Sequence, residues 1–227
     1  MPPSDALARR IAPATTALLT VECQRGVVGE GSALPELAAL VRETGVLERI
    51  ADLVESARAA GVQVVHAVAE RRPDGRGANR NAPLFRAVER LPVRQLAGTD
   101  AVRIAPPVTV GDGDLVTRRL HGLSPLAGTG VDALLRNLGR RTVVVVGVSA
   151  NVAVPNAVFD LVNLGYTAVV VEDAIAGVPA VYTRAMVRYT LGLVATVAST
   201  AEVRECWRGA PEGGQGGSPR PGGLRPA

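Results

Sequence analysis

The stretch TVVVVGVSANVAVPN, residues 142–156, joins two kinds of pattern at one point. Its first half is a continuous run of branched apolar residues, which predicts a strand buried on both faces in the middle of a sheet. Its second half begins a helix from about Asn151 to Leu164, and Pro155 fits the first turn because no internal hydrogen bond is lost there. In open α/β folds such a strand-to-helix junction is where ligands bind. The residue at its centre, Ala153, has no reactive group.

The rest of the chain repeats this alternation of strand and helix patterns. Further strands are expected at 17–22, 62–69, 114–120, 167–174 and 195–200, and helices at 46–61, 131–139, 183–193 and 202–207. Alternation of this kind indicates a parallel sheet with helices on both faces and right-handed crossovers. We therefore predict an α/β protein with a three-layer α-β-α fold and a six-stranded, mostly parallel, Rossmann-like sheet.

The length of 227 residues suits one sizeable α/β domain. We expect this domain to span residues 1–208, followed by a flexible Gly/Pro-rich tail over 209–227 that has too little apolar surface to repay ordering. Residues 70–102 are polar and punctuated by Gly and Pro, so they are expected to form an excursion with one short helix. Long excursions inside compact domains are often functional.

Charge and cysteine content exclude several classes of protein. The net charge is +4 and every basic side chain is Arg, but the arginines alternate with acids, so no nucleic-acid partner is expected. No stretch reaches the roughly 20 apolar residues of a membrane span, and the start lacks a signal-peptide core, so a cytoplasmic protein without membrane contact is expected. Cys23 and Cys206 are too isolated for a disulfide framework or zinc site. We predict no metal and no cofactor.

Candidate site residues follow from the carboxyl ends of the predicted strands, where ligands bind in open parallel sheets. These ends carry Glu22, His66 and either Arg118 or Arg119, and the turn 147–153 lies beside them. An acid, cationic side chains and a helix N-terminus are thus expected around one crevice. The free backbone N–H groups of that N-terminus favour an anion or a carbonyl oxygen.

Three segments make the chain resemble the isochorismatase-like, or cysteine hydrolase, family. They are ALLTVECQRG at 17–26, RRLHGLSPLAGTGVDALLRNLG at 118–139 and VVVVGVSANVAVPNAVFDLVNLGYTAVVVEDAIAG at 143–177. The resemblance implies the family fold, a small-molecule substrate and a homodimer or larger even homo-oligomer. It also implies a triad of Asp, Lys and Cys, and this chain departs from it at each place, with Glu22, Arg119 and Ala153.

The three replacements differ in their chemical consequences. Ala153 cannot act as a thiol nucleophile, and Cys23 cannot take its place because adjacent strand residues point to opposite faces. Glu22 can still transfer a proton, whereas Arg119 keeps a positive charge but cannot donate a proton near neutral pH. The isochorismatase branch of the family works without the cysteine, through acid catalysis.

We therefore expect a hydrolase that acts on a small anionic metabolite by non-covalent acid catalysis, with Glu22 and Arg119 as the catalytic pair. The alternative is a catalytically inactive pseudoenzyme that binds a small molecule or serves assembly, and a conventional thiol amidase is disfavoured. Arg118, Arg119, Arg71 and Arg80 are expected to bind carboxylates through paired guanidinium hydrogen bonds.

The expected substrate-binding residues are Gln24, His66, Arg118, His121, Ser149, Ala150, Asn151 and Ala153. For several of them a structural role is an open alternative: Glu22 as part of an ion pair, His66 bonded to a loop backbone, and Asn151 as a helix cap.

Overall fold

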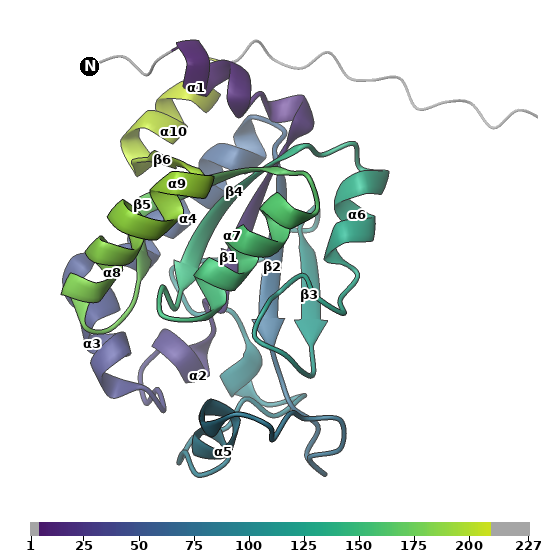
Figure 1. Cartoon of the computed structure of the whole chain (residues 1–227), viewed down its shortest axis with the longest axis vertical. Helices are drawn as coiled ribbons and strands as arrows, with labels where there is room; N and C mark the ends of the chain where they lie inside the picture. Colours follow the sequence, from purple (N-terminus) through teal and green to yellow (C-terminus); the bar gives the residue numbers. More distant parts are fainter. Residues whose placement is uncertain (1–4, 210–227) are drawn as a thin grey trace, which may run out of the picture.

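Six parallel strands form the centre of the molecule in the computed structural model, which describes residues 5–209 (Figure 1). The strand order is β3-β2-β1-β4-β5-β6. Their bounds are β1 Thr16–Val21, β2 Gln63–Ala69, β3 Leu115–Arg119, β4 Thr142–Val148, β5 Thr167–Ala176 and β6 Thr196–Ala198. The predicted six-stranded α/β sheet is confirmed, and every pairing in it is parallel.

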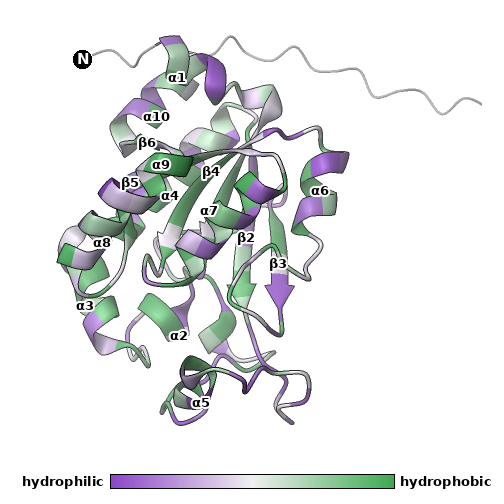
Figure 2. Ribbon diagram, viewed as in Figure 1, coloured by the Kyte–Doolittle hydropathy of each residue, from purple (hydrophilic) through white to green (hydrophobic). Residues whose placement is uncertain are grey.

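Helices cover both faces of the sheet, because alternate residues of each strand point to opposite sides. In β1, Leu18 packs into one apolar cluster, whereas Ala17 and Leu19 pack into the other. The first cluster is closed by α1 (Asp5–Arg10), α3 (Pro35–Thr44), α4 (Val46–Ala59) and α10 (Thr200–Arg208). The second is closed by α6 (Val131–Asn137), α7 (Ala153–Asn163) and α8 (Ala180–Met186) with the π-helical turn Val187–Leu191 that follows it. Figure 2 shows hydrophobic strands between helices of mixed polarity.

Several helices differ from the sequence-based expectation. The structure adds α1, α2 (Arg25–Val28) and α3, none of which was predicted. For α3 the sequence does carry signals: Pro35 opens its first turn, and Gly45 closes it in the left-handed region at φ 65°. Helix α7 starts two residues later than expected, and α8 starts three residues earlier than the expected 183–193 helix.

The excursion after β2 lies beyond the carboxyl ends of the strands (Figure 1). It contains α5 (Pro83–Val88), the one short helix expected there, and a 3-10 turn at Asp100–Val102. Backbone bridges between Arg71 and Leu96 and between Gln24 and Ile104 hold it against the sheet. The excursion is therefore positioned to cover whatever lies at that edge.

The strand order places a ligand crevice between β1 and β4. From β1 the chain winds outward through β2 to β3, and then returns to β4 and winds the other way to β6. The carboxyl ends of the two strands that flank this reversal leave a gap between their connections, which is where ligands bind in such sheets. Within residues 5–209, none of the helices combines the length and apolarity needed to cross a membrane. Of the expected tail over 209–227, only Gly209 belongs to the described residues.

Candidate active site

Glycine is required where β4 passes β1 at the crevice. Gly147 pairs with Val21 and has φ 112°, a conformation that L side chains rarely adopt. A Cβ at this position would lie 2.2 Å from the Val21 carbonyl oxygen. The absence of a side chain thus lets the two strands end side by side, and their next residues, Glu22 and the turn at 149–153, face the same space.

Glu22 and Arg119 form an ion pair at the base of this space. Arg119 Nη2 donates to Glu22 Oε1, and the two side chains are 8% and 16% exposed for Arg119 and Glu22 respectively. Glu22 has φ 50°, the only positive φ of a non-glycine residue among the described ones, while its N–H still donates to the Ala67 carbonyl at 2.9 Å. Such backbone conformations cost energy and tend to occur at functional sites. The left-handed turn directs the carboxylate toward β3 and Arg119.

One guanidinium nitrogen of Arg119 is left without a hydrogen-bond partner. Arg119 Nε donates to the Gly122 carbonyl at 3.4 Å and Nη2 donates to Glu22, but Nη1 is buried and has no acceptor within the described part of the chain. A buried donor without an acceptor is costly. A ligand oxygen placed beside Arg119 would remove that cost.

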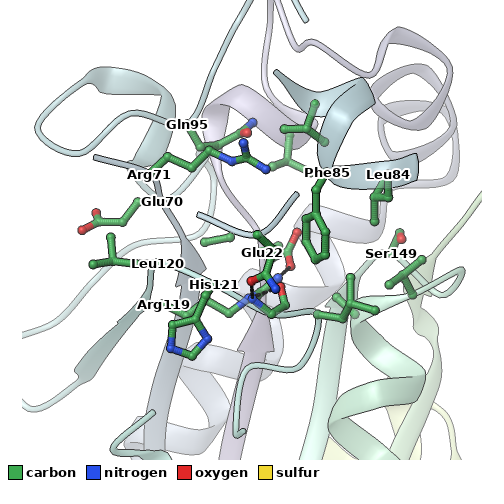
Figure 3. A pocket seen from close by; sticks show the side chains of 18 of the residues that line it. Glu22, Glu70, Arg71, Leu84, Phe85, Gln95, Arg119, Leu120, His121 and Ser149 are labelled. Atoms are coloured by element: carbon green, nitrogen blue, oxygen red, sulfur yellow. Dashed lines mark hydrogen bonds and ion pairs between the residues drawn. The ribbon is translucent and has the colours of Figure 1, made fainter. Parts of the chain in front are cut away.

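A pocket of about 180 Å³ surrounds the pair (Figure 3). Its wall is largely apolar, and Phe85 points from α5 toward the Glu22–Arg119 pair. The apolar lining residues are Val27, Leu34, Ala69, Leu84, Phe85, Val88, Leu91, Leu120, Leu123, Val152 and Ala153. The polar lining residues are Glu22, Glu70, Arg71, Asn79, Gln95, Arg119, His121 and Ser149. The site can therefore hold a small molecule with an apolar body and a polar end.

Five of the residues chosen from the sequence line this pocket. They are Glu22, Arg119, His121, Ser149 and Ala153, and Arg71, expected to bind a carboxylate, lines it as well. Ala153 is the first residue of α7, so the turn in front of it presents the helix N-terminus to the pocket. The expected convergence of Glu22, Arg119 and Ala153 is thus present in the geometry, whereas the chemical role of each remains a prediction.

Three other chosen residues bond to the backbone or pack in the core instead. The Gln24 amide is fully buried, donating to the Ala69 carbonyl at 2.9 Å and accepting from the Ala69 N–H at 2.8 Å. The Asn151 amide makes the same kind of pair with Val178, at 2.6 and 2.9 Å, and does not cap α7, whose N-cap is Val152. Ala150 is fully buried in the apolar cluster beneath α7. These side chains shape the loops around the pocket without lining it.

His66 lies in the middle of β2, not at its end as the sequence suggested. Its ring is fully buried, with Nδ1 2.8 Å from Thr20 Oγ1 and Nε2 3.1 Å from Asp114 Oδ2. Arg58 also contacts Asp114, with Nη2 2.5 Å from Oδ2. Burial lowers the pKa of His66, and its hydrogen bond to Asp114 only partly opposes this. The histidine belongs to a structural cluster inside the sheet.

The arginines expected to bind anions are each paired with a carboxylate. Arg118 points away from Arg119, since they are neighbours on a strand, and pairs with Glu70 at 3.1 Å. Arg71 and Arg80 both pair with Glu89, at 3.6 and 3.1 Å, and only Arg71 lines the pocket. The charged lining residues are two acids and two arginines, so the pocket has no excess positive charge.

Apart from Arg71, sequence reasoning missed the pocket residues that the excursion contributes. Phe85 and Leu84 of α5, together with Gln95 and Asn79, complete the pocket, and Gln95 Nε2 donates to the Gly26 carbonyl at 3.0 Å. The only signal for them was the position of a long excursion directly after a strand that ends at the crevice. Within residues 5–209, no group of three or more His, Cys, Asp or Glu side chains is arranged to hold a metal ion.

Comparison with known proteins identifies the family of this chain. The family model of the isochorismatase domain matches residues 16–202. A ureidoacrylate amidohydrolase of Methylorubrum extorquens is 33% identical over 180 residues, covering 73% of this chain and 72% of that protein. A cysteine hydrolase from Pseudomonas syringae has the same fold, with a TM-score of 0.75 at 24% identity over 88% of this chain and 95% of that one. An isochorismatase family protein from Desulfovibrio vulgaris gives a TM-score of 0.72 at 25% identity, covering 82% and 95%. The chain belongs to the isochorismatase family.

Proposed function

We propose that this protein hydrolyses a small metabolite without a covalent thiol intermediate, with Glu22 moving the proton and water as the nucleophile. The observation that carries the proposal is the Glu22–Arg119 pair, which faces Ala153 across one pocket in an isochorismatase-family fold. A carboxylate is the one group of these three that can exchange a proton near neutral pH. Ala153 leaves the reacting group of the substrate open to water.

The ion pair bears on the direction of proton transfer. As a base, the Glu22 carboxylate accepts a proton from water as the hydroxyl adds to the substrate, and Arg119 holds the carboxylate in place. Acid catalysis, expected from the sequence, needs the carboxylic acid instead. A pH-rate profile separates the two, because a base loses activity on the acid side and an acid loses it on the alkaline side.

The pocket lining supports a substrate with an apolar body and one oxygen-bearing end. A carbonyl or carboxylate oxygen would accept from Arg119 Nη1, a buried donor at the pocket that has no hydrogen-bond partner within residues 5–209. Leu84 and Phe85 would cover the apolar body. The sequence suggested an anionic metabolite, and the balanced charges of the pocket allow one only if its charge lies at the Arg119 end. An amide or ureide bond is one candidate, because a curated relative is a ureidoacrylate amidohydrolase.

The test is turnover of a panel of small amides, ureides, esters and enol ethers, followed by mass spectrometry. Glu22→Gln keeps the shape and removes the proton chemistry, so turnover should fall by about 100-fold or more while substrate binding changes little. Glu70→Gln is the matched comparison, since Glu70 also lines the pocket but is held by Arg118. It should reduce turnover far less. Arg119→Lys should chiefly weaken binding, because an ammonium group lacks the planar fork that bonds to Glu22 through Nη2 and offers Nη1 to the ligand.

A binding protein without catalysis is the second candidate, and Ala153 is the observation that favours it. In that case a ligand would bind to wild type and to Glu22→Gln alike, and neither protein would convert it. Equal turnover of an identified substrate by wild type and Glu22→Gln would refute the proposed mechanism.

A further inference from the structure

Arg71 and Gln95 place two polar side chains at the end of the pocket away from Arg119. Figure 3 shows them side by side in the upper part of the view, with Glu22 and Arg119 below them. Their backbones are joined, because the Arg71 N–H donates to the Gln95 carbonyl at 2.7 Å. The oxygen-bearing end and the apolar body proposed for the substrate use neither side chain. The two residues therefore form a separate part of the pocket, which we call the Arg71–Gln95 subsite.

The Arg71 guanidinium has hydrogen-bond donors to spare. Its Nη1 lies 3.6 Å from Glu89 Oε1, beyond a normal hydrogen bond, and Arg80 Nε already donates to that oxygen at 3.1 Å. Within residues 5–209 the Arg71 side chain makes no hydrogen bond, although only 16% of it is exposed. Its charge is balanced by Glu89, so what it offers to a ligand is a set of free N–H donors.

Gln95 contributes an acceptor whose position is fixed. Its Nε2 donates to the Gly26 carbonyl at 3.0 Å, which distinguishes the amide nitrogen from the amide oxygen. A side chain at position 26 would crowd this contact, since an added Cβ would lie 3.1 Å from Nε2. Gln95 Oε1 has no hydrogen-bond partner in the described part of the chain. The half-buried Gln95 thus has one free acceptor next to the free donors of Arg71.

We propose that the Arg71–Gln95 subsite binds a neutral amide group at the far end of the substrate, distinct from the bond that is hydrolysed. An amide supplies both missing partners: its carbonyl oxygen accepts from Arg71, and its N–H donates to Gln95 Oε1. A carboxylate would bind to Arg71 but would place a second acceptor against Gln95 Oε1, in a pocket whose charges already balance. An apolar end would leave the donors and the acceptor without partners. The inference rests on the proposed function only in taking this pocket as the substrate site.

The test is calorimetric titration of the full chain with small carboxylic acids of increasing chain length. The carboxylate is meant to accept from Arg119 Nη1, and the other end is a carboxamide, a methyl ketone or an isopropyl group, which have nearly the same shape. Wild type should bind the best carboxamide about 10-fold more tightly than its isopropyl counterpart, with the ketone, which accepts but cannot donate, in between. Glu22→Gln should keep this order, since the measurement does not require turnover.

Two substitutions assign the carbonyl and the N–H of the probe to their partners. Arg71→Met removes the donors at similar length, so the ketone should lose its advantage over the isopropyl acid. Gln95→Met removes the acceptor, so the carboxamide should lose its advantage over the ketone. Arg80→Met is the matched control, because Arg80 pairs with the same Glu89 but does not line the pocket, and it should keep the wild-type order. Circular dichroism shows that each variant is folded.

Equal binding of the carboxamide and isopropyl acids by wild type, or no binding of any of them, would overturn the proposal. So would an Arg71→Met variant that binds the isopropyl acids far more weakly than wild type does, because the carboxylate would then lie at Arg71. A protein that binds the probes in the expected order but converts no member of the substrate panel would refute the proposed hydrolysis and support the subsite.

Discussion

Cys23 and Ala153 follow neighbouring strands, yet only Ala153 faces the pocket. Cys23 is fully buried, with its Sγ 3.6 Å from the Val21 carbonyl oxygen, and burial, with a smaller effect of Glu22, raises its pKa to about 12. A thiol with such a pKa has almost no reactive thiolate near neutral pH. The only other cysteine of the chain, Cys206, is buried as well.

Returning a thiol to position 153 tests this difference between the two residues. Native wild type should react very slowly with iodoacetamide, whereas Ala153→Cys should gain one rapidly labelled thiol because its side chain would project into the pocket. Intact-mass spectrometry counts the labels, and urea-unfolded wild type, in which both cysteines should be labelled, is the control. Rapid labelling of Cys23 in native wild type would contradict the strand register at Glu22.

Some residues of the site could be predicted from the sequence, and others could not. Glu22, Arg119 and Ala153 were placed together because parallel strands deliver their carboxyl ends to one edge. Gln24 and Asn151 were misassigned because a polar residue near that edge can bond to a ligand or to a loop backbone, and the sequence is the same in both cases. Their amides satisfy the N–H and C=O groups of Ala69 and Val178.

At the scale of elements, the approach of β4 to β1 makes Gly147 the most restrictive position near the site. Gly147→Ala should lower the free energy of unfolding by about 3 kcal/mol or more, because the added Cβ would overlap the Val21 backbone as well as strain φ. Gly165 is the matched control: it also has a positive φ, of 88°, but a Cβ there would have no neighbouring atom within 4 Å. Gly165→Ala should therefore cost only about 1 kcal/mol.

Urea unfolding monitored by Trp fluorescence gives both free energies. Equal costs for the two substitutions would mean that β1 and β4 are not in close contact at the crevice.

The excursion after β2 could be located from the sequence, but the positions of its side chains could not be predicted. The strands and most of the longer helices have regular apolar periods and were predicted close to their observed bounds, whereas α3 was missed. In α5 the run PLFRAV is too short for a period to be measured, so Leu84 and Phe85 could not be assigned to the pocket. Their positions depend on contacts between residues distant in sequence, such as Arg71 with Leu96.

At the scale of the whole molecule, a cluster of polar groups is buried inside the sheet near β3. His66 of β2 contacts Thr20 of β1 and Asp114 before β3, and Arg58 of α4 closes the cluster. Burial by itself would raise the pKa of Asp114, but hydrogen bonds from Arg58, the Gly111 N–H and His66 outweigh it and lower that pKa. The cluster therefore links β1, β2, α4 and the residue that precedes β3. A change in its protonation should affect the stability of the whole molecule.

The pH dependence of that stability can be predicted from His66. Its pKa is lowered below the ordinary value of 6.5, so between 6.5 and the lowered value the unfolded chain binds a proton that the folded chain does not. The free energy of unfolding should then fall as the pH drops below 6.5, by up to about 1.4 kcal/mol per pH unit for this one group. His66→Gln should flatten that slope in urea titrations from about pH 7.5 to 5, and it should also lower the stability at neutral pH.

His121→Gln is the matched control, because His121 is the only other histidine of the chain and is exposed at the pocket. It should keep the wild-type slope. If instead His121→Gln flattened the slope and His66→Gln did not, the proton uptake would belong to the pocket and not to the buried cluster.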